Sequence, residues 1–311
     1  MRRVLSQMHG VRQSCCHLTQ TLATASNDSK SIIENIYMSN SLGRSFIVNW
    51  LHVSTPVISR CTNLQNSHLQ FGSPANKQMV MKLYAVSDGP PSLSVRQALA
   101  KLELPFELVN VDFGKGEHMT TEYALLNPQK EIPVLDDDGF HLSESNAILQ
   151  YICDKYTPGN ELYPQEAKAR AIVNHRLCFN LSTYYANISA YTMAPIFFDY
   201  QRTELGLKKV HMALDVFETY LQRLGTKYAA ADHLTIADFQ LINSTMTLEA
   251  IDFDFSKYTK IYKWYNDFKT QYPELWKISE DAMKEIQYFA ANPPDLSHLN
   301  HPIHPIRKIN K

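Results

Sequence analysis

Residues 127–156 read NPQKEIPVLDDDGFHLSESNAILQYICDKY, and this stretch decides the fold. Pro133 comes just before a short apolar strand at Val134-Leu135, and Asp138-Gly139 follows the strand. These two residues tolerate the positive φ angles of a two-residue hairpin turn, so the chain returns as a neighbouring strand. The segment Ser143-Glu144-Ser145 then opens a helix. The stretch therefore predicts a hairpin that leads directly into a helix.

The same stretch outlines a binding site for a small peptide. A cis bond at Pro133 would turn the backbone of Ile132 outward as an unpaired edge. Such an edge can accept an extended peptide as an added strand. The free N–H groups of the helix start lie next to the Glu144 carboxylate, so the site offers donors and an acceptor side by side.

The rest of the chain predicts two domains and two terminal segments. Strand, helix and hairpin signals alternate up to Tyr156, which favours a four-stranded mixed sheet in an α/β, thioredoxin-like domain. Helical periodicity then runs without strand signals and predicts an all-α bundle, in which Thr235 and Asp238 form a capping box. The predicted divisions are an N-terminal extension at 1–78, the α/β domain at 79–158, the all-α domain at 165–292 and a Pro/His-containing tail at 293–311.

Charge and composition exclude several classes of function. Residues 1–78 hold seven of the 30 basic residues and two of the 31 acidic residues, so the remainder has a net charge of −6. An acidic body without a basic stripe argues against nucleic-acid binding. The longest apolar run in the extension is too short to span a membrane. Five cysteines without metal-site spacing argue against a disulfide framework and predict no metal site.

The extension at 1–78 is rich in Ser and Asn, and its composition predicts disorder. Its first 27 residues contain three Arg and no acidic residue, as mitochondrial transit peptides do. Translation from Met79 or Met81 is the alternative, which would make the extension an upstream artefact. Cytoplasmic localisation is the prediction, and mitochondrial localisation is the alternative if the extension is real.

The order NPQ-x-x-IPVL, DDG, L-x-ES-x-AI and later LTIADF at 234–239 resembles the cytosolic glutathione transferases. The insect delta/epsilon group is the most similar, over about residues 79–295. The resemblance implies a homodimeric detoxification enzyme that presents glutathione thiolate to hydrophobic small molecules. It implies glutathione as co-substrate and no other cofactor. The alternative is a glutathione- and hydrophobic-ligand-binding protein of the same fold that has little or no catalytic activity.

The resemblance also assigns roles around glutathione. Glu144 would pair with the ammonium group, and Ser145 with the adjoining N–H groups would hold the γ-glutamyl carboxylate. Ile132, oriented by Pro133, would pair with the cysteinyl backbone. The remaining cationic candidates for the glycyl carboxylate are His118 and Lys130. Each has a simpler interpretation, because Glu144 and Ser145 can merely cap a helix and the other two can be solvated surface residues.

The catalytic group is harder to assign. Delta and epsilon enzymes use a serine at the turn after the first strand, where this chain has Gly89. Ser87 and Ser92 are the nearest hydroxyls, and main-chain N–H groups between them are a third means of stabilising the thiolate. Ser87 can instead serve a turn, and Ser92 can instead cap the next helix.

Aromatic residues after residue 180 suggest the second substrate's site. The resemblance places part of this region around an apolar cavity, whereas an aromatic stripe alone is more often core. The candidates are Tyr184, Tyr185, Met193, Phe197 and Tyr288. In the tail, His298, His301 and His304 recur every three residues without an evident scaffold, which favours a mobile segment over a metal site.

Overall fold

The structure is a computed structural model that describes residues 38–39, 45–46 and 80–305. The chain divides into two compact units, Met1–Gly72 and Ser73–Lys311. In the first, the described residues are the antiparallel strands β1 (Met38–Ser39) and β2 (Ser45–Phe46). The predicted disorder and transit peptide fall on residues 1–78, which lie outside the described part except for these two strands. The second unit carries the fold that the motifs predict.

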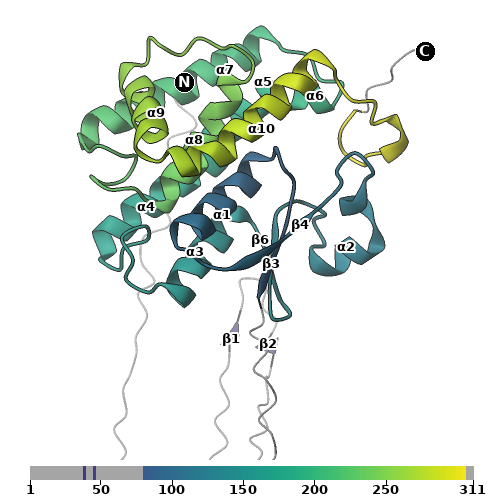
Figure 1. Cartoon of the computed structure of the whole chain (residues 1–311), viewed down its shortest axis with the longest axis horizontal. Coiled ribbons are helices and arrows are strands. Elements are labelled where there is room, and N and C mark those ends of the chain that lie inside the picture. The colour runs from purple at the N-terminus through teal and green to yellow at the C-terminus, as the bar shows by residue number, and fades with distance from the viewer. Residues whose placement is uncertain (1–37, 40–44, 47–79, 306–311) are drawn as a thin grey trace, which may run out of the picture. The chain divides into compact units, whose positions relative to one another are not determined.

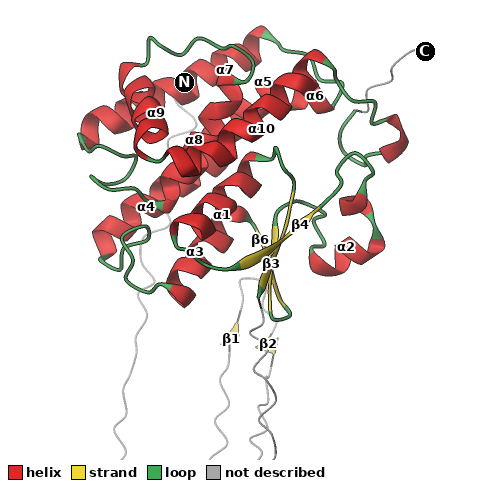
Figure 2. Cartoon of the chain, in the orientation of Figure 1, coloured by secondary structure: helices red, strands yellow, loops and turns green. Residues whose placement is uncertain are grey.

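A four-stranded mixed sheet forms the first half of the second unit (Figures 1 and 2). The strands are β3 (Met81–Ala85), β4 (Phe106–Asn110), β5 (Val134–Asp137) and β6 (Phe140–Ser143), in the order β4-β3-β5-β6. The β3–β4 pair is parallel because the helix α1 (Pro90–Lys101) connects the two strands, and the other pairs are antiparallel. The predicted α/β arrangement is confirmed.

The hairpin and the helix after it also follow the sequence. Asp138 and Gly139 have φ angles of 56° and 82°, and the Asp136 carboxylate accepts a 2.8 Å hydrogen bond from Gly139 N. The Ile132–Pro133 peptide bond is cis, as the sequence suggested. The remaining helices of this half are η1 (Glu117–Met119), α2 (Thr121–Leu126) and α3 (Ser145–Tyr156).

Helices form the second half, and α8 lies at its centre. Every residue from 236 to 248 is buried, so this helix has no solvent-exposed face over that range. The elements are α4 (Ala167–Phe179), the π-helical turn η2 (Asn180–Tyr184), α5 (Tyr185–Thr192), α6 (Ala194–Phe197), α7 (Glu204–Leu224), α8 (Ile236–Glu249), α9 (Thr259–Gln271), α10 (Pro273–Ala291) and η3 (Ser297–Leu299). The π-helical turn separates α4 from α5, and the 3₁₀ turn η3 follows α10.

The capping box at the start of α8 is confirmed as a structural feature. Asp238 accepts hydrogen bonds from Thr235 N and Thr235 Oγ1, both at 2.9 Å. Its other oxygen accepts bonds from Ala229 N at 2.8 Å and Trp264 Nε1 at 2.9 Å. This buried carboxylate therefore joins α8 to α9 and to the loop before α8.

A buried polar network joins the two halves. Helix α1 packs against α8 and α10. Gln97 on α1 donates to Leu275 O at 3.0 Å and to Ser279 Oγ at 2.8 Å, and it accepts from Asn243 Nδ2 at 2.7 Å. Ser279 Oγ in turn donates to Asn243 Oδ1 at 2.7 Å. Because each of these buried groups has a partner, the network fixes α1 on the helical half.

The described residues contain no helix long and apolar enough to cross a membrane.

Candidate active site

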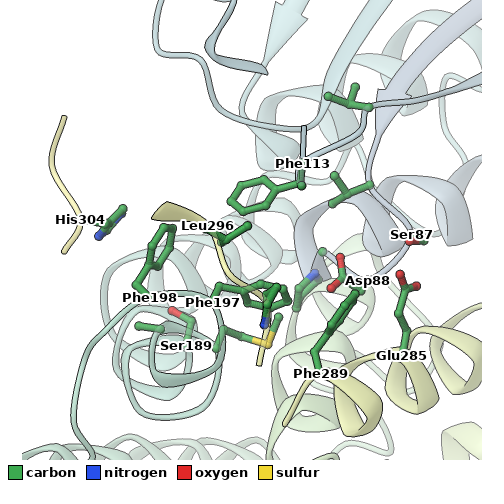
Figure 3. Close-up of a pocket in the computed structure, with 18 of the residues that line it drawn as sticks. Ser87, Asp88, Phe113, Ser189, Phe197, Phe198, Glu285, Phe289, Leu296 and His304 are labelled. Atoms are coloured by element: carbon green, nitrogen blue, oxygen red, sulfur yellow. The ribbon is translucent and has the colours of Figure 1, made fainter. Parts of the chain in front are cut away.

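A cavity of about 870 Å³ lies where the two halves meet (Figure 3). Its walls come from the turn after β3, the loop after β4, helices α5, α6 and α10, and the residues that follow α10. Most of the lining is apolar and aromatic, which is typical of a small-molecule site. Ser87, Asp88 and Glu285 lie together at the end formed by residues 86–90, which is called the polar end below (Figure 3).

Gly89 lies at this polar end, and a side chain does not fit there without a shift. It caps α1 with extended backbone angles, φ −77° and ψ 115°. A Cβ atom added to Gly89 would lie 2.6 Å from Val86 Cγ2, well inside normal contact. The Val86 methyl group thus takes the space next to the position where the sequence resemblance implies a serine.

The two serine candidates have different surroundings. Ser87 is exposed and lines the cavity. Ser92 is fully buried away from the cavity lining, and its Oγ has no hydrogen-bond partner among the described residues. It does not cap α1, because the helix begins two residues earlier with Pro90, whose fixed φ suits the first turn.

Two carboxylates share the polar end, and sequence reasoning did not identify them. Asp88 comes from the turn after β3 and Glu285 from α10, and both face the same end of the cavity (Figure 3). Burial, followed by the negative charge of Glu285, raises the pKa of Asp88 to about 6. Nearby, burial is the main cause that raises the pKa of the Tyr185 phenol, and the charges of Asp88 and Glu131 add to it. The site therefore holds a carboxyl group that can exchange a proton near neutral pH.

The predicted peptide-binding residues lie around the cis bond. Pro133 is buried and Ile132 half-buried, just before β5. Glu144 has a positive φ of 64° at the start of α3, and its exposed carboxylate accepts a 3.2 Å bond from Gln129 Nε2. A non-glycine residue in this conformation stores strain, which is common at ligand-binding sites. Ser145 Oγ accepts a 2.7 Å bond from Gln240 Nε2 on α8.

His118 and Lys130 lie near each other on the edge of the α/β half. The His118 side chain is 3% exposed, and its ring stacks on Phe113 with 4.5 Å between centroids. Neither ring nitrogen has a partner within the described part of the chain. Burial, followed by the positive charges of His301 and Lys130, lowers the pKa of His118 to about 4. His118 is therefore neutral at pH 7, while Lys130 Nζ donates to Met119 O at 2.6 Å.

The aromatic candidates divide between cavity, core and surface. Tyr185, Met193 and Phe197 line the cavity. Tyr184 is instead fully buried in the helical core, where its hydroxyl lies 3.0 Å from Thr245 Oγ1. Tyr288 is 63% exposed, because on α10 it is the next residue, Phe289, that faces the cavity.

The tail also contributes to the lining, contrary to the expectation of a segment without a scaffold. Leu296 and His304 face the cavity together with Phe113 from the α/β half (Figure 3). The described residues contain no group of three or more His, Cys, Asp or Glu that could hold a metal ion. No periodic pattern in the tail indicates that it returns to the cavity, so sequence reasoning missed these residues.

Comparison with known proteins identifies the family. Family models for the N-terminal and C-terminal domains of glutathione S-transferase match residues 79–154 and 184–271. A diazinon-metabolizing glutathione S-transferase from the silkworm Bombyx mori is 80% identical, with 67% of this chain and 100% of that chain covered and a TM-score of 0.64. The chain belongs to the glutathione S-transferase family. The predicted resemblance is confirmed.

Two further solved structures support the assignment. A delta-class glutathione transferase from Nilaparvata lugens is 33% identical, with 68% of this chain and 99% of that chain covered and a TM-score of 0.64. A glutathione transferase homologue from Drosophila mojavensis, solved with bound glutathione, is 27% identical, with 69% and 98% covered and a TM-score of 0.63. As a glutathione S-transferase, the protein binds glutathione and catalyses its conjugation. The alternative of a non-catalytic binding protein is not favoured.

Proposed function

We propose that the second substrates of this transferase are apolar electrophiles, and that they include organophosphates of the diazinon type. The observation that carries the proposal is the cavity of about 870 Å³, lined by Phe113, Phe197 and Phe289. Aromatic walls favour apolar, ring-bearing molecules. The silkworm enzyme that is 80% identical is described as diazinon-metabolizing, which supports the same substrate class.

Glutathione then occupies the edge that leads into this cavity. Ile132, held by the cis bond to Pro133, pairs with the cysteinyl backbone of glutathione. Glu144 takes the ammonium group, and Ser145 with the first N–H groups of α3 takes the γ-glutamyl carboxylate. His118 and Lys130 hold the glycyl carboxylate, the first as a neutral donor and the second as a cation. The arrangement needs no cofactor besides glutathione.

The start of α1 stabilises the thiolate. Pro90 and Pro91 have no N–H groups, so the main-chain donors at this end are those of Gly89 and Ser92. Together with the N-terminal end of the helix dipole they favour an anion. Ser87 is the preferred side-chain donor because it lines the cavity, whereas the Ser92 hydroxyl lies away from the lining.

Kinetics of single variants test these roles. Wild-type protein is assayed with a chlorodinitrobenzene and with diazinon, each against the uncatalysed reaction. Glu144→Gln raises the KM for glutathione about tenfold or more, because a charge-assisted hydrogen bond contributes about 1.5–3 kcal/mol. Ser87→Ala lowers kcat, and Ser92→Ala serves as its matched control. Wild-type rates equal to the uncatalysed rates would refute the substrate proposal, and equal kcat values for the two serine variants would refute the preference for Ser87.

Assembly and localisation complete the proposal. The transferase forms a homodimer in the cytoplasm, as the resemblance to cytosolic enzymes implies. Light scattering during gel filtration gives the mass of the assembly, and a monomer mass would refute the dimer. Fractionation of native tissue, followed by N-terminal sequencing, tests the compartment and the start of the mature chain.

A further inference from the structure

The residues after α10 fold back along the cavity. Pro294 and Leu296 line it immediately after the helix ends, and His304 lines it farther along. Leu296 is only 3% exposed, yet it belongs to neither hydrophobic cluster of the described core. Leu296 is therefore covered by the other residues that line the cavity, and not by the core clusters. The segment 293–305 is called the tail wall below.

One anchor of the tail wall lies on the α/β half, at the loop after β4. His298 Nε2 donates a 2.7 Å hydrogen bond to Gly114 O. Two residues along the loop, Gly116 has a φ of 75°, and a Cβ atom there would lie 2.6 Å from Leu299 Cδ2. The tail wall therefore approaches this backbone so closely that a side chain at Gly116 would require Leu299 to shift, and the positive φ also favours glycine.

The other anchor lies on the helical half, just after α6. The His304 ring stacks on Phe198 with 4.3 Å between centroids, and its Nδ1 lies 3.3 Å from the Tyr200 hydroxyl. Asp199 N donates a 3.2 Å hydrogen bond to Pro305 O. Leu296 precedes both anchors in the chain and faces the cavity between Phe113 and Phe197 in Figure 3.

We propose that the tail wall sets which electrophiles this transferase accepts, with Leu296 as the specificity-determining residue. The wall favours compact, flat electrophiles, which fit between Leu296 and the aromatic side chains of the opposite face. Electrophiles with branched substituents meet the Leu296 side chain and require the wall to move. The anchors include three hydrogen bonds and one ring stack at the rim, so the wall can separate without disturbing the core. This inference rests on the proposed role of the cavity as the electrophile site.

The test compares Leu296→Ala with Ile303→Ala in the full chain. Ile303 lies on the same segment, has a similar side chain and is 79% exposed, so it is the matched control. The measurement is the ratio of kcat/KM for diazinon to kcat/KM for a chlorodinitrobenzene. One extra or missing methylene group in a hydrophobic pocket changes such ratios by about 10–200-fold. We expect Leu296→Ala to raise the ratio about tenfold, with unchanged KM for glutathione, and Ile303→Ala to leave it unchanged.

A second measurement does not depend on turnover. A fluorescent anilinonaphthalene sulfonate probe is loaded into the cavity, and its dissociation rate is measured by rapid dilution. His298→Ala removes one anchor without touching the lining, so we expect faster dissociation in this variant and in Leu296→Ala than in wild type. Ratios and dissociation rates equal to those of Ile303→Ala would overturn the inference. Absence of wild-type conjugation would instead refute the proposed substrates, while the dissociation rates would still test the wall.

Discussion

Replacing Asp88 with asparagine should stabilise the protein at neutral pH. Folding raises the pKa of the Asp88 carboxyl from its usual 3.8 to about 6, chiefly through burial. The ionised Asp88 carboxylate is less stable in the folded protein than in the unfolded chain. It therefore lowers the free energy of unfolding fully above about pH 6 and not at all below about pH 4. A shift of roughly two pKa units corresponds to about 3 kcal/mol. We therefore expect Asp88→Asn to raise the free energy of unfolding by up to about 3 kcal/mol at pH 7.5.

Equilibrium urea unfolding at a fixed protein concentration between pH 4 and 7.5 measures this effect. The informative quantity is the difference between variant and wild type, because other groups titrate in both proteins. It should fall from about 3 kcal/mol at pH 7.5 towards zero at pH 4. Asp252→Asn is the control, since it changes an exposed carboxylate whose positive φ asparagine tolerates.

Glu285 provides an internal check on the cause. Its negative charge is the second contribution to the raised pKa of Asp88, after burial. In a Glu285→Gln background, the stabilisation by Asp88→Asn should shrink but persist. A variant-minus-wild-type difference that is the same at pH 4 and pH 7.5 would show that Asp88 is not held in a desolvated site. The reasoning about the polar end of the cavity would then be wrong.

Three further changes have definite expected outcomes in the same unfolding assay. Gly89→Ser should cost about 1–3 kcal/mol because its Cβ meets Val86 Cγ2, and adding Val86→Ala should recover part of that loss. Asp238→Ala should lower the free energy of unfolding by more than about 2 kcal/mol, since it removes the helix cap and leaves Trp264 Nε1 without its acceptor. A loss below about 0.5 kcal/mol, which is usual for surface changes, would contradict this. Asn243→Leu should cost about 1–3 kcal/mol by orphaning Gln97, and an unchanged midpoint would argue against the network.

Local sequence patterns predicted the elements that depend on interactions between neighbouring residues. The hairpin at Asp138-Gly139, the cis bond before Pro133 and the capping box at Thr235 each depend on a few neighbouring residues. Such signals are read directly from residue type and spacing. The α/β fold followed because these elements occur in an order that few architectures accommodate.

The cavity depends on contacts that no local pattern encodes. Asp88 and Glu285 lie near opposite ends of the transferase sequence, and neither belongs to a recognisable motif. The π-helical turn η2 adds a residue to one helical turn just before Tyr185 and shifts the phase of the residues that follow; Tyr184 lies in the core and Tyr185 at the cavity. Helical periodicity cannot show such a change of phase. The return of the tail likewise depends on the shape of the loop at Gly116.

The network around Gln97 has a consequence for local unfolding. Helix α1 belongs to the α/β half by sequence, yet its buried hydrogen bonds are made to Asn243 and Ser279 on the helical half. Opening α1 alone would leave these groups unpaired in an apolar interior. Amide hydrogens in the middle of α1 should therefore exchange with solvent at the slow rate of α8, and not at the faster rate of the edge strand β6. The turn at residues 86–90, which leads into α1, would then belong to the most slowly exchanging part of the molecule. The tail wall at residues 293–305 remains free to open.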